Sequence, residues 1–161
     1  FNYRNVLWNG GPKPPTRTVF DGVLVDAPCS GMGTWGRNPH ARWTTTPDDV
    51  RELAIVQRDL LHHVAPSVKP GGRLVYSVCT LSRAETTEVA DAFGAAHPEF
   101  EPVPLVNPFQ PDTAAVHPLC LWPQDTGGNG MFVAAWRRRP ELPAKPEDPS
   151  PLEPIPESAS E

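Results

Sequence analysis

The chain contains one strand–helix–strand pattern, and this pattern limits the possible folds more than any other feature. Strands are expected at residues 19–26 and 73–79, and the apolar run at 23–25 is typical of a strand covered on both faces. Between them, T-P-D-D at 46–49 starts a helix that K-P-G-G at 69–72 ends. A helical crossover predicts that the two strands are parallel. The apolar positions that define the helix are Leu53, Val56, Leu60, Leu61, Val64 and Val68.

The second half of the chain continues the alternation of helices and strands. Ser82 and Glu85 have the spacing of a capping box, which predicts a helix that ends before Pro98. Further strands are expected at residues 100–106, 120–122 and 131–136. The order of these elements predicts an α/β fold with a parallel sheet that an antiparallel hairpin closes at one edge.

Two cysteines follow the carboxyl ends of the two predicted strands. Asp26 and Cys29 belong to D-A-P-C, and Cys79 ends S-V-C. In open α/β sheets ligands bind beyond these ends, so the three side chains meet in one crevice if the strands are neighbours. A thiolate is a strong nucleophile, which indicates covalent catalysis. A cysteine at the end of a buried strand can equally be a small apolar residue, and residue type alone leaves both readings open.

The acidic character of the chain comes from its last segment. Residues 140–161 hold seven prolines, six acidic residues and one lysine, which accounts for the formal net charge of −5. This composition predicts a disordered tail, because it offers little apolar surface to bury. The remaining 139 residues are neutral, so the overall charge does not exclude a nucleic-acid partner.

Cysteine spacing and hydropathy exclude other classes of protein. The three cysteines form no C-x-x-C pair, which argues against a zinc ribbon, so no metal is expected. An odd number of cysteines favours a reduced, cytoplasmic setting. No stretch approaches the roughly 18 apolar residues that span a bilayer, which argues against an integral membrane protein.

Four motifs occur in a fixed order along the chain: D-A-P-C-S-G at 26–31, G-R-N-P-H-A-R-W at 36–43, K-P-G-G-R-L-V-Y-S-V-C-T at 69–80 and G-G-N-G-M-F-V-A at 127–134. With these motifs the chain resembles the Nop/Sun family of RNA (cytosine-5)-methyltransferases from about residue 19 to residue 139. The resemblance implies a Rossmann-like class I methyltransferase fold. It also implies transfer of a methyl group from S-adenosylmethionine to C5 of cytosine in ribosomal or transfer RNA.

The resemblance assigns roles to the strand-end residues. Cys79 matches the nucleophile that attacks C6 of the target cytosine, and Cys29 matches the cysteine implicated in product release. Asp26 matches the acid between the base and the cofactor, where its carboxyl group can bond the cytosine edge. Asp26 and Pro28, which shapes the turn, are also the expected cofactor contacts.

The resemblance further implies an RNA-binding loop after the first strand. Its expected RNA contacts are Ser30, Gly31, Arg37 and Arg42. Trp43 either stacks on a base or packs under the loop, and both readings stay open. The consecutive arginines at 137–139 are interpreted as a solvated strand end more readily than as phosphate contacts.

Two parts of the family pattern have no match in the chain. A glycine-rich cofactor turn after a strand is missing, and so is the acid at a strand end that holds the ribose. Residues 1–139 are therefore expected to be the C-terminal portion of a catalytic domain, inactive alone and partnered by the N-terminal part of the same protein. The alternative is a non-catalytic RNA- or protein-binding module derived from a methyltransferase.

Overall fold

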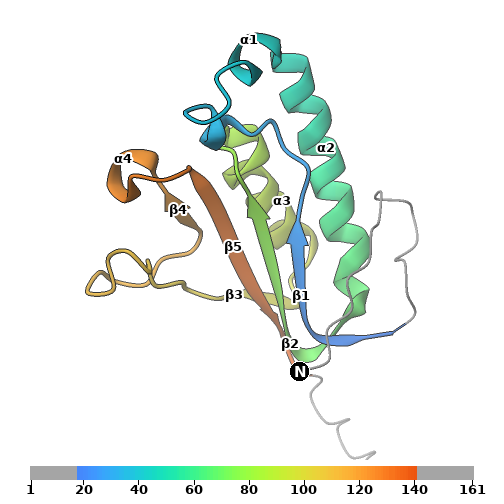
Figure 1. Cartoon of the computed structure of the whole chain (residues 1–161). Coiled ribbons are helices and arrows are strands. Elements are labelled where there is room, and N and C mark those ends of the chain that lie inside the picture. The colour runs from blue at the N-terminus through green and yellow to red at the C-terminus, as the bar shows by residue number, and fades with distance from the viewer. Residues whose placement is uncertain (1–17, 141–161) are drawn as a thin grey trace, which may run out of the picture.

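The computed structural model describes residues 18–140 of the chain, and the predicted disordered tail lies outside the described residues except for Pro140. The strands form one five-stranded sheet in the order β1-β2-β5-β3, with β4 also paired to β5 (Figure 1). The strands are β1 (Phe20–Asp26), β2 (Val68–Val78), β3 (Phe100–Pro102), β4 (Leu119–Leu121) and β5 (Met131–Arg138). The α-helices are α1 (Ala41–Thr44), α2 (Pro47–Val64), α3 (Thr87–Ala96) and α4 (Pro123–Thr126). The short 3-10 turns are η1 (Met32–Thr34), η2 (Ala65–Ser67) and η3 (Arg83–Glu85).

Strands β1 and β2 are parallel neighbours, as the strand–helix–strand pattern predicts. Asp26 pairs with Ser77 at their carboxyl ends, and α2 forms the crossover between them. Strand β5 then runs antiparallel to β2, β3 and β4. The expected α/β sheet with an antiparallel edge is therefore confirmed, with β5 in the middle of the antiparallel part.

Helix α2 begins as predicted and ends earlier than predicted. The Thr46 hydroxyl accepts a hydrogen bond from the Asp49 amide, and the Asp49 carboxylate accepts one from the Thr46 amide, which completes a capping box. The helix stops at Val64 because Pro66 has no amide hydrogen to continue the ladder. The K-P-G-G segment at 69–72 therefore belongs to β2 and does not end the helix.

The buried face of α2 also differs from the predicted one. Its buried residues are Val50, Ala54, Gln57, Leu60 and Leu61, a stripe that includes a polar side chain. Leu53 is only half-buried and Val56 is exposed, so the predicted apolar stripe is displaced around the helix.

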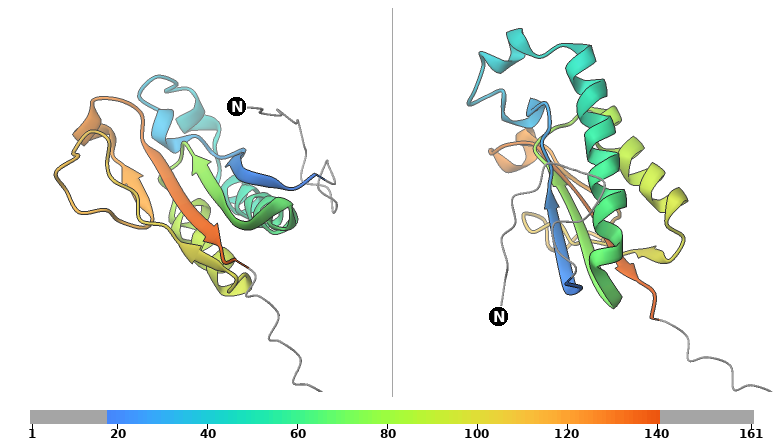
Figure 2. Two further views of the ribbon diagram at one scale, coloured as in Figure 1. Left: turned by 90° about the horizontal axis from the view of Figure 1, so that it is seen from below. Right: turned by 90° about the vertical axis from the view of Figure 1, so that its right-hand side faces the viewer.

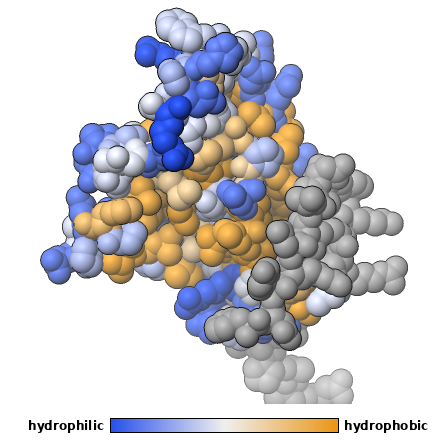
Figure 3. All heavy atoms as spheres, viewed as in Figure 1, coloured by the Kyte–Doolittle hydropathy of each residue, from blue (hydrophilic) through white to orange (hydrophobic). Residues whose placement is uncertain are grey.

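Both long helices lie on the same face of the sheet (Figures 1 and 2). The core between them and the sheet holds alternate residues of β2 and β5, among them Tyr76, Phe132 and Trp136. The prediction that residues 23–25 are covered on both faces is wrong for the described part of the chain. Leu24 is 66% exposed, because β1 is an edge strand and its open face has no helix over it among residues 18–140. Figure 3, viewed from this side, shows apolar side chains across the strands.

Two local predictions in the second half are wrong. Ser82 and Glu85 form no capping box, because Thr86 is the N-cap of α3 and the Ser82 side chain makes no cap bond. The strand predicted at 100–106 ends at Pro102, since Pro102 and Pro104 have no amide hydrogen for a ladder. Among residues 18–140, no helix is long and apolar enough to cross a bilayer.

Candidate active site

The carboxyl ends of β1 and β2 bring the two motif cysteines into contact. The Ala27 amide donates to the Ser77 carbonyl at 3.1 Å, which continues the β1–β2 pairing into the loop. Beyond it, the Cys29 and Cys79 sulfur atoms lie 3.5 Å apart, close enough for one thiol to donate to the other sulfur. The predicted convergence of the two cysteines at one strand-end crevice is confirmed.

Burial favours the neutral form of the Cys29 thiol. The side chain is half-buried, and this desolvation is the main cause that raises the Cys29 pKa to about 12. Contact with Cys79 raises the pKa further, while a hydrogen bond from the Gly31 backbone opposes the shift. Cys29 is therefore a neutral thiol near pH 7, and its S–H group is available to donate to the Cys79 sulfur. Cys120, the third cysteine, is half-buried in β4, and burial raises its pKa as well.

A buried carboxylate beneath the cysteines connects the two loops. Glu85 is fully buried, and its two carboxylate oxygens accept hydrogen bonds from three separate segments of the chain. Ser30 donates its amide at 2.8 Å and its hydroxyl at 2.5 Å. Thr80 donates its hydroxyl at 3.0 Å, and Gln57 donates its amide nitrogen at 3.2 Å. The sequence did not reveal this role, because the S-x-x-E spacing has the same form as a capping box.

Two glycines hold the loop after β1 against the ends of β2 and β5. The Gly33 amide donates to the Cys79 carbonyl at 3.0 Å, and the Gly130 amide donates to the Gly33 carbonyl at 2.8 Å. A Cβ on Gly33 would lie 2.2 Å from the Gly130 carbonyl oxygen. Glycine is therefore required at position 33 by the close approach of two backbones. This contact gives the G-G-N-G motif a structural role.

Asp26 and Pro28 lie beside the cysteine pair and are exposed. The Pro28 carbonyl accepts a hydrogen bond from the Gln57 amide nitrogen at 2.8 Å, which ties the turn to α2. Asp26 ends β1 opposite Ser77, at the strand ends that Cys29 and Cys79 follow. Its role as a base-contacting acid stays a prediction.

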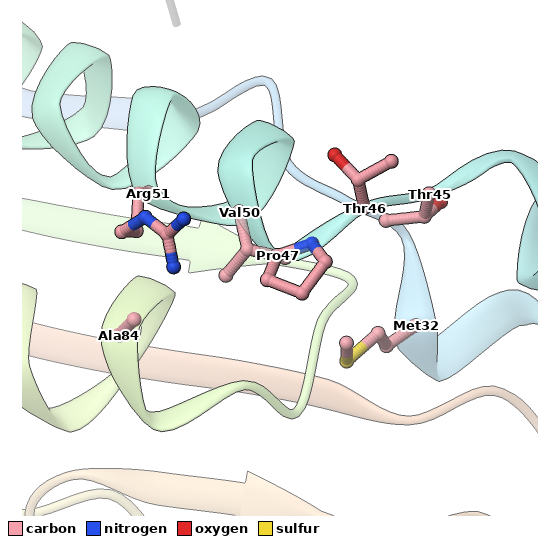
Figure 4. A pocket seen from close by; sticks show the side chains of 7 residues that line it. All are labelled: Met32, Thr45, Thr46, Pro47, Val50, Arg51 and Ala84. Atoms are coloured by element: carbon pink, nitrogen blue, oxygen red, sulfur yellow. The ribbon is translucent and has the colours of Figure 1, made fainter.

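Two cavities adjoin the site. One of about 450 Å³ lies against the cysteine loop and the exposed flank of α2, and the other, of about 340 Å³, lies between η1, the start of α2 and η3 (Figure 4). The first is lined by Cys29, Ser30, Thr44, Thr45, Asp49, Glu52, Leu53 and Val56. The second is lined by Met32, Thr45, Thr46, Pro47, Val50, Arg51 and Ala84.

Neither cavity is lined by Asp26 or Pro28, the two expected cofactor contacts. Leu24, which precedes them in β1, is exposed on a face of the sheet that no helix of residues 18–140 covers. One of the two cavities thus reaches the cysteine pair, through Cys29, and neither reaches the expected cofactor contacts.

The predicted RNA-binding loop is exposed above the strand ends. Arg37, Arg42 and Trp43 are all exposed, and the indole is 80% accessible. The Arg42 guanidinium lies 5.7 Å from the centre of the Trp43 ring, a cation–π contact. This exposure excludes the reading of Trp43 as a residue packed under the loop.

The arginines at 137–139 lie at the opposite end of the sheet. Arg137 pairs in register with Arg73, six residues before Cys79, which follows the end of β2. The Arg137 and Arg138 side chains donate to the Gly71 and Val68 carbonyls, at 3.3 and 2.7 Å. Arg139 forms an exposed ion pair with Glu101. These partners support the interpretation of the triplet as a strand end.

The sheet and its paired strand-end cysteines place the chain among Rossmann-like methyltransferases. The solved structure of PH0851 is 39% identical, with a TM-score of 0.68 over 73% of this chain and 26% of that one. A methyltransferase homologue from Pyrococcus horikoshii is 30% identical, with a TM-score of 0.57 over 75% of this chain and 40% of that one. Both likenesses confirm the expected fold class.

Within that class, the chain belongs to the 16S rRNA methyltransferase RsmB/F family, whose family model matches residues 5–137. It is 43% identical over 128 residues to the probable ribosomal RNA small subunit methyltransferase B of Bacillus subtilis. That match covers 74% of this chain and 28% of the Bacillus protein. The resemblance to the Nop/Sun family is confirmed, and the chain spans less than a third of the length of this relative.

Proposed function

We propose that the protein methylates C5 of a cytosine in RNA, with S-adenosylmethionine as the methyl donor. The observation that carries this proposal is the contact between Cys29 and Cys79 at the ends of two parallel strands, in a chain of a methyltransferase family. The names of the relatives favour ribosomal RNA as the substrate, with transfer RNA as the other candidate. Such a substrate implies a cytoplasmic location.

In this proposal Cys79 is the nucleophile. Its thiolate adds to C6 of the cytosine, and the electron pair of the C5–C6 double bond makes C5 nucleophilic. After methylation a base removes the C5 proton, the double bond forms again and the sulfur–C6 bond breaks. The sulfur then leaves as a thiolate.

Cys29 is suited to assist that last step. Because burial keeps it a neutral thiol, it can donate its proton in a hydrogen bond to the departing Cys79 sulfur, 3.5 Å away. A donor aimed at the atom where charge develops stabilises the transition state. This accounts physically for the role in product release that the family resemblance implies.

The remaining site residues are proposed to bind the base and the RNA. Asp26 bonds the cytosine edge, Arg37 and Arg42 contact phosphates, and the exposed Trp43 ring stacks on a base. RNA contacts by Ser30 and Gly31 have less support. The Ser30 amide and hydroxyl already donate to Glu85, and the Gly31 carbonyl already accepts from the Thr34 amide.

We further propose that residues 1–139 are part of a catalytic domain whose cofactor half lies elsewhere in the same protein. The open face of β1 and the short coverage of the relatives support this division. Its consequence is that the 161-residue chain alone is inactive. Because neither cavity is lined by Asp26 or Pro28, one alternative is a non-catalytic RNA- or protein-binding module.

The test is methylation of ribosomal RNA by the full-length protein, read as 5-methylcytosine by mass spectrometry. The Cys79→Ser variant should lose all activity, and Cys29→Ala should accumulate a covalent protein–RNA adduct. Cys120→Ser is the matched control, because Cys120 lies in β4, which β5 separates from β2, and it should retain activity. Full activity of Cys79→Ser would disprove the mechanism, and RNA binding without methylation would support the binding module.

A further inference from the structure

Glu85 connects the two segments that carry the cysteines. Ser30 directly follows Cys29, and Thr80 directly follows Cys79, and both donate their hydroxyls to the same carboxylate oxygen, Oε2. Their own hydroxyl oxygens are 2.9 Å apart. The carboxylate thus lies between the residues that immediately follow the two cysteines.

Further contacts fix the carboxylate itself. Gln57 on α2 donates to Oε1, the oxygen that also accepts the Ser30 amide. The main chain of Glu85 is held separately, because the Tyr76 hydroxyl donates to the Glu85 carbonyl at 2.7 Å. Burial is the main cause that raises the Tyr76 pKa, so this hydroxyl remains a donor. The Glu85 carboxylate is therefore anchored to α2, and the Glu85 main chain is anchored to β2.

The donors fit an ionised carboxylate and no other common side chain. Two N–H and two O–H groups point at two oxygens, and a carboxylate accepts at every position. A glutamine at this position would turn an NH2 group toward at least one of these donors. A buried charge costs stability compared with an apolar side chain of similar size, so stability alone does not account for Glu85.

We propose that Glu85 is the positioning residue that holds Cys29 and Cys79 at contact distance. The proposal deepens the proposed function, on which its catalytic meaning rests. The carboxylate sets the place of the residue after each cysteine, and the two sulfurs meet as a result. Glu85 is fully buried, so its proposed role is to position the cysteines and not to contact the base or the cofactor.

The first experiment measures how readily Cys29 and Cys79 form a disulfide, which depends on the distance between their sulfur atoms. It needs no methyltransferase activity. In a Cys120→Ser background, the full-length protein is equilibrated with glutathione buffers, and the fraction of Cys29–Cys79 disulfide is read by mass spectrometry after alkylation. Oxidation by glutathione disulfide forms one protein disulfide and two glutathione thiols. Glu85→Gln should lower the equilibrium constant at least tenfold, which corresponds to about 30 mV.

The matched control is Glu88→Gln, since Glu88 is exposed in the first turn of α3. It should leave the equilibrium constant within twofold of the parent. The same result for a folded Glu85→Gln would overturn the proposal, and so would a parent protein whose thiols do not form the disulfide. If Glu85→Gln does not fold, Ser30→Ala removes a single donor. It should lower the constant at least threefold, and an unchanged constant overturns the proposal.

The second experiment is methylation kinetics with the same variants. Glu85→Gln should lower kcat at least tenfold and leave the KM for RNA within threefold, because the proposed phosphate contacts Arg37 and Arg42 are unchanged. An unchanged kcat overturns the positioning role. If the parent protein methylates no RNA, the proposed function fails, while the thiol equilibrium still decides whether Glu85 positions the cysteines.

Discussion

Gly33 and Gly130 touch through their backbones, and this contact closes the loop after β1 over the end of the sheet. The Gly130 amide donates to the Gly33 carbonyl at 2.8 Å, while the Gly33 amide donates to Cys79. Two consecutive hydrogen bonds thus connect Gly130, Gly33 and the proposed nucleophile Cys79, which lie in three segments that are distant in sequence. The geometry of the cysteine pair therefore depends on backbone packing as well as on Glu85.

Replacement of Gly33 by alanine should destabilise the fold. The new Cβ would lie 2.2 Å from the Gly130 carbonyl oxygen, and backbone atoms on both sides have to move apart. We expect a loss of about 1–3 kcal/mol in the free energy of unfolding, measured by urea denaturation. Gly36→Ala is the matched control, because a Cβ on Gly36 meets no atom within 4 Å. Equal stability of the two variants would contradict the contact.

The reactivity of Cys29 should report its raised pKa. With a pKa of about 12, the Cys29 thiolate fraction and the rate of alkylation by iodoacetamide should still rise about tenfold per pH unit between pH 8 and pH 10. Contact with Cys79 is one of the causes that raise the pKa, so Cys79→Ala should move the profile to lower pH. Alkylation is mapped by peptide mass spectrometry. A rate that levels off below pH 9 in the parent would contradict the buried, neutral thiol.

The fold and the cysteine pair could be predicted from the sequence because both depend on local patterns. The apolar runs predicted the strands β1 and β2, and the helical crossover between them predicted that they are parallel. The parallel arrangement of these neighbouring strands brings Cys29 and Cys79 to one edge of the sheet. The helix end was mispredicted because Pro66 lies within an otherwise continuous apolar pattern.

The remaining errors share a physical cause, which is that a side chain far away in sequence decides the outcome. Glu85 has the local form of a capping residue, and only the fold shows that four donors from other segments surround it. Gln57 likewise looks like a surface residue on a helix, and its burial follows from its contacts with Pro28 and Glu85. Leu24 was predicted to be covered, and its exposure depends on which helices lie over β1.

The capping box of α2 should make stability depend on pH in the acid range. The Thr46 backbone amide, followed by the Thr46 hydroxyl, holds the pKa of Asp49 below its ordinary value of 3.8. A lowered folded-state pKa stabilises the fold above the unfolded-state value, and this contribution is lost as the pH falls through the folded-state value. Asp49→Asn should therefore be less stable than the parent at pH 7.

The difference in the free energy of unfolding between the parent and Asp49→Asn should narrow as the pH falls below 3.8. Urea denaturation at several pH values measures this difference. Asp59→Asn serves as the control, because Asp59 is exposed in the middle of the same helix. A difference that stays constant down to acid pH would show that the Asp49 carboxylate does not act through its charge.

The exposed arginines of the loop after β1 should bind RNA through phosphates. Each phosphate contact releases counterions, so Arg37→Ala and Arg42→Ala should each weaken binding to a single-stranded RNA and reduce the slope of log affinity against log salt by about one. Arg137→Ala is the matched control, since Arg137 lies at the opposite end of the sheet from Cys79. Fluorescence anisotropy with a labelled oligonucleotide at several salt concentrations measures both quantities. An equal loss of slope in Arg137→Ala would indicate that the RNA binds the surface without preference for the cysteine end, and the proposed orientation of the substrate would then be wrong.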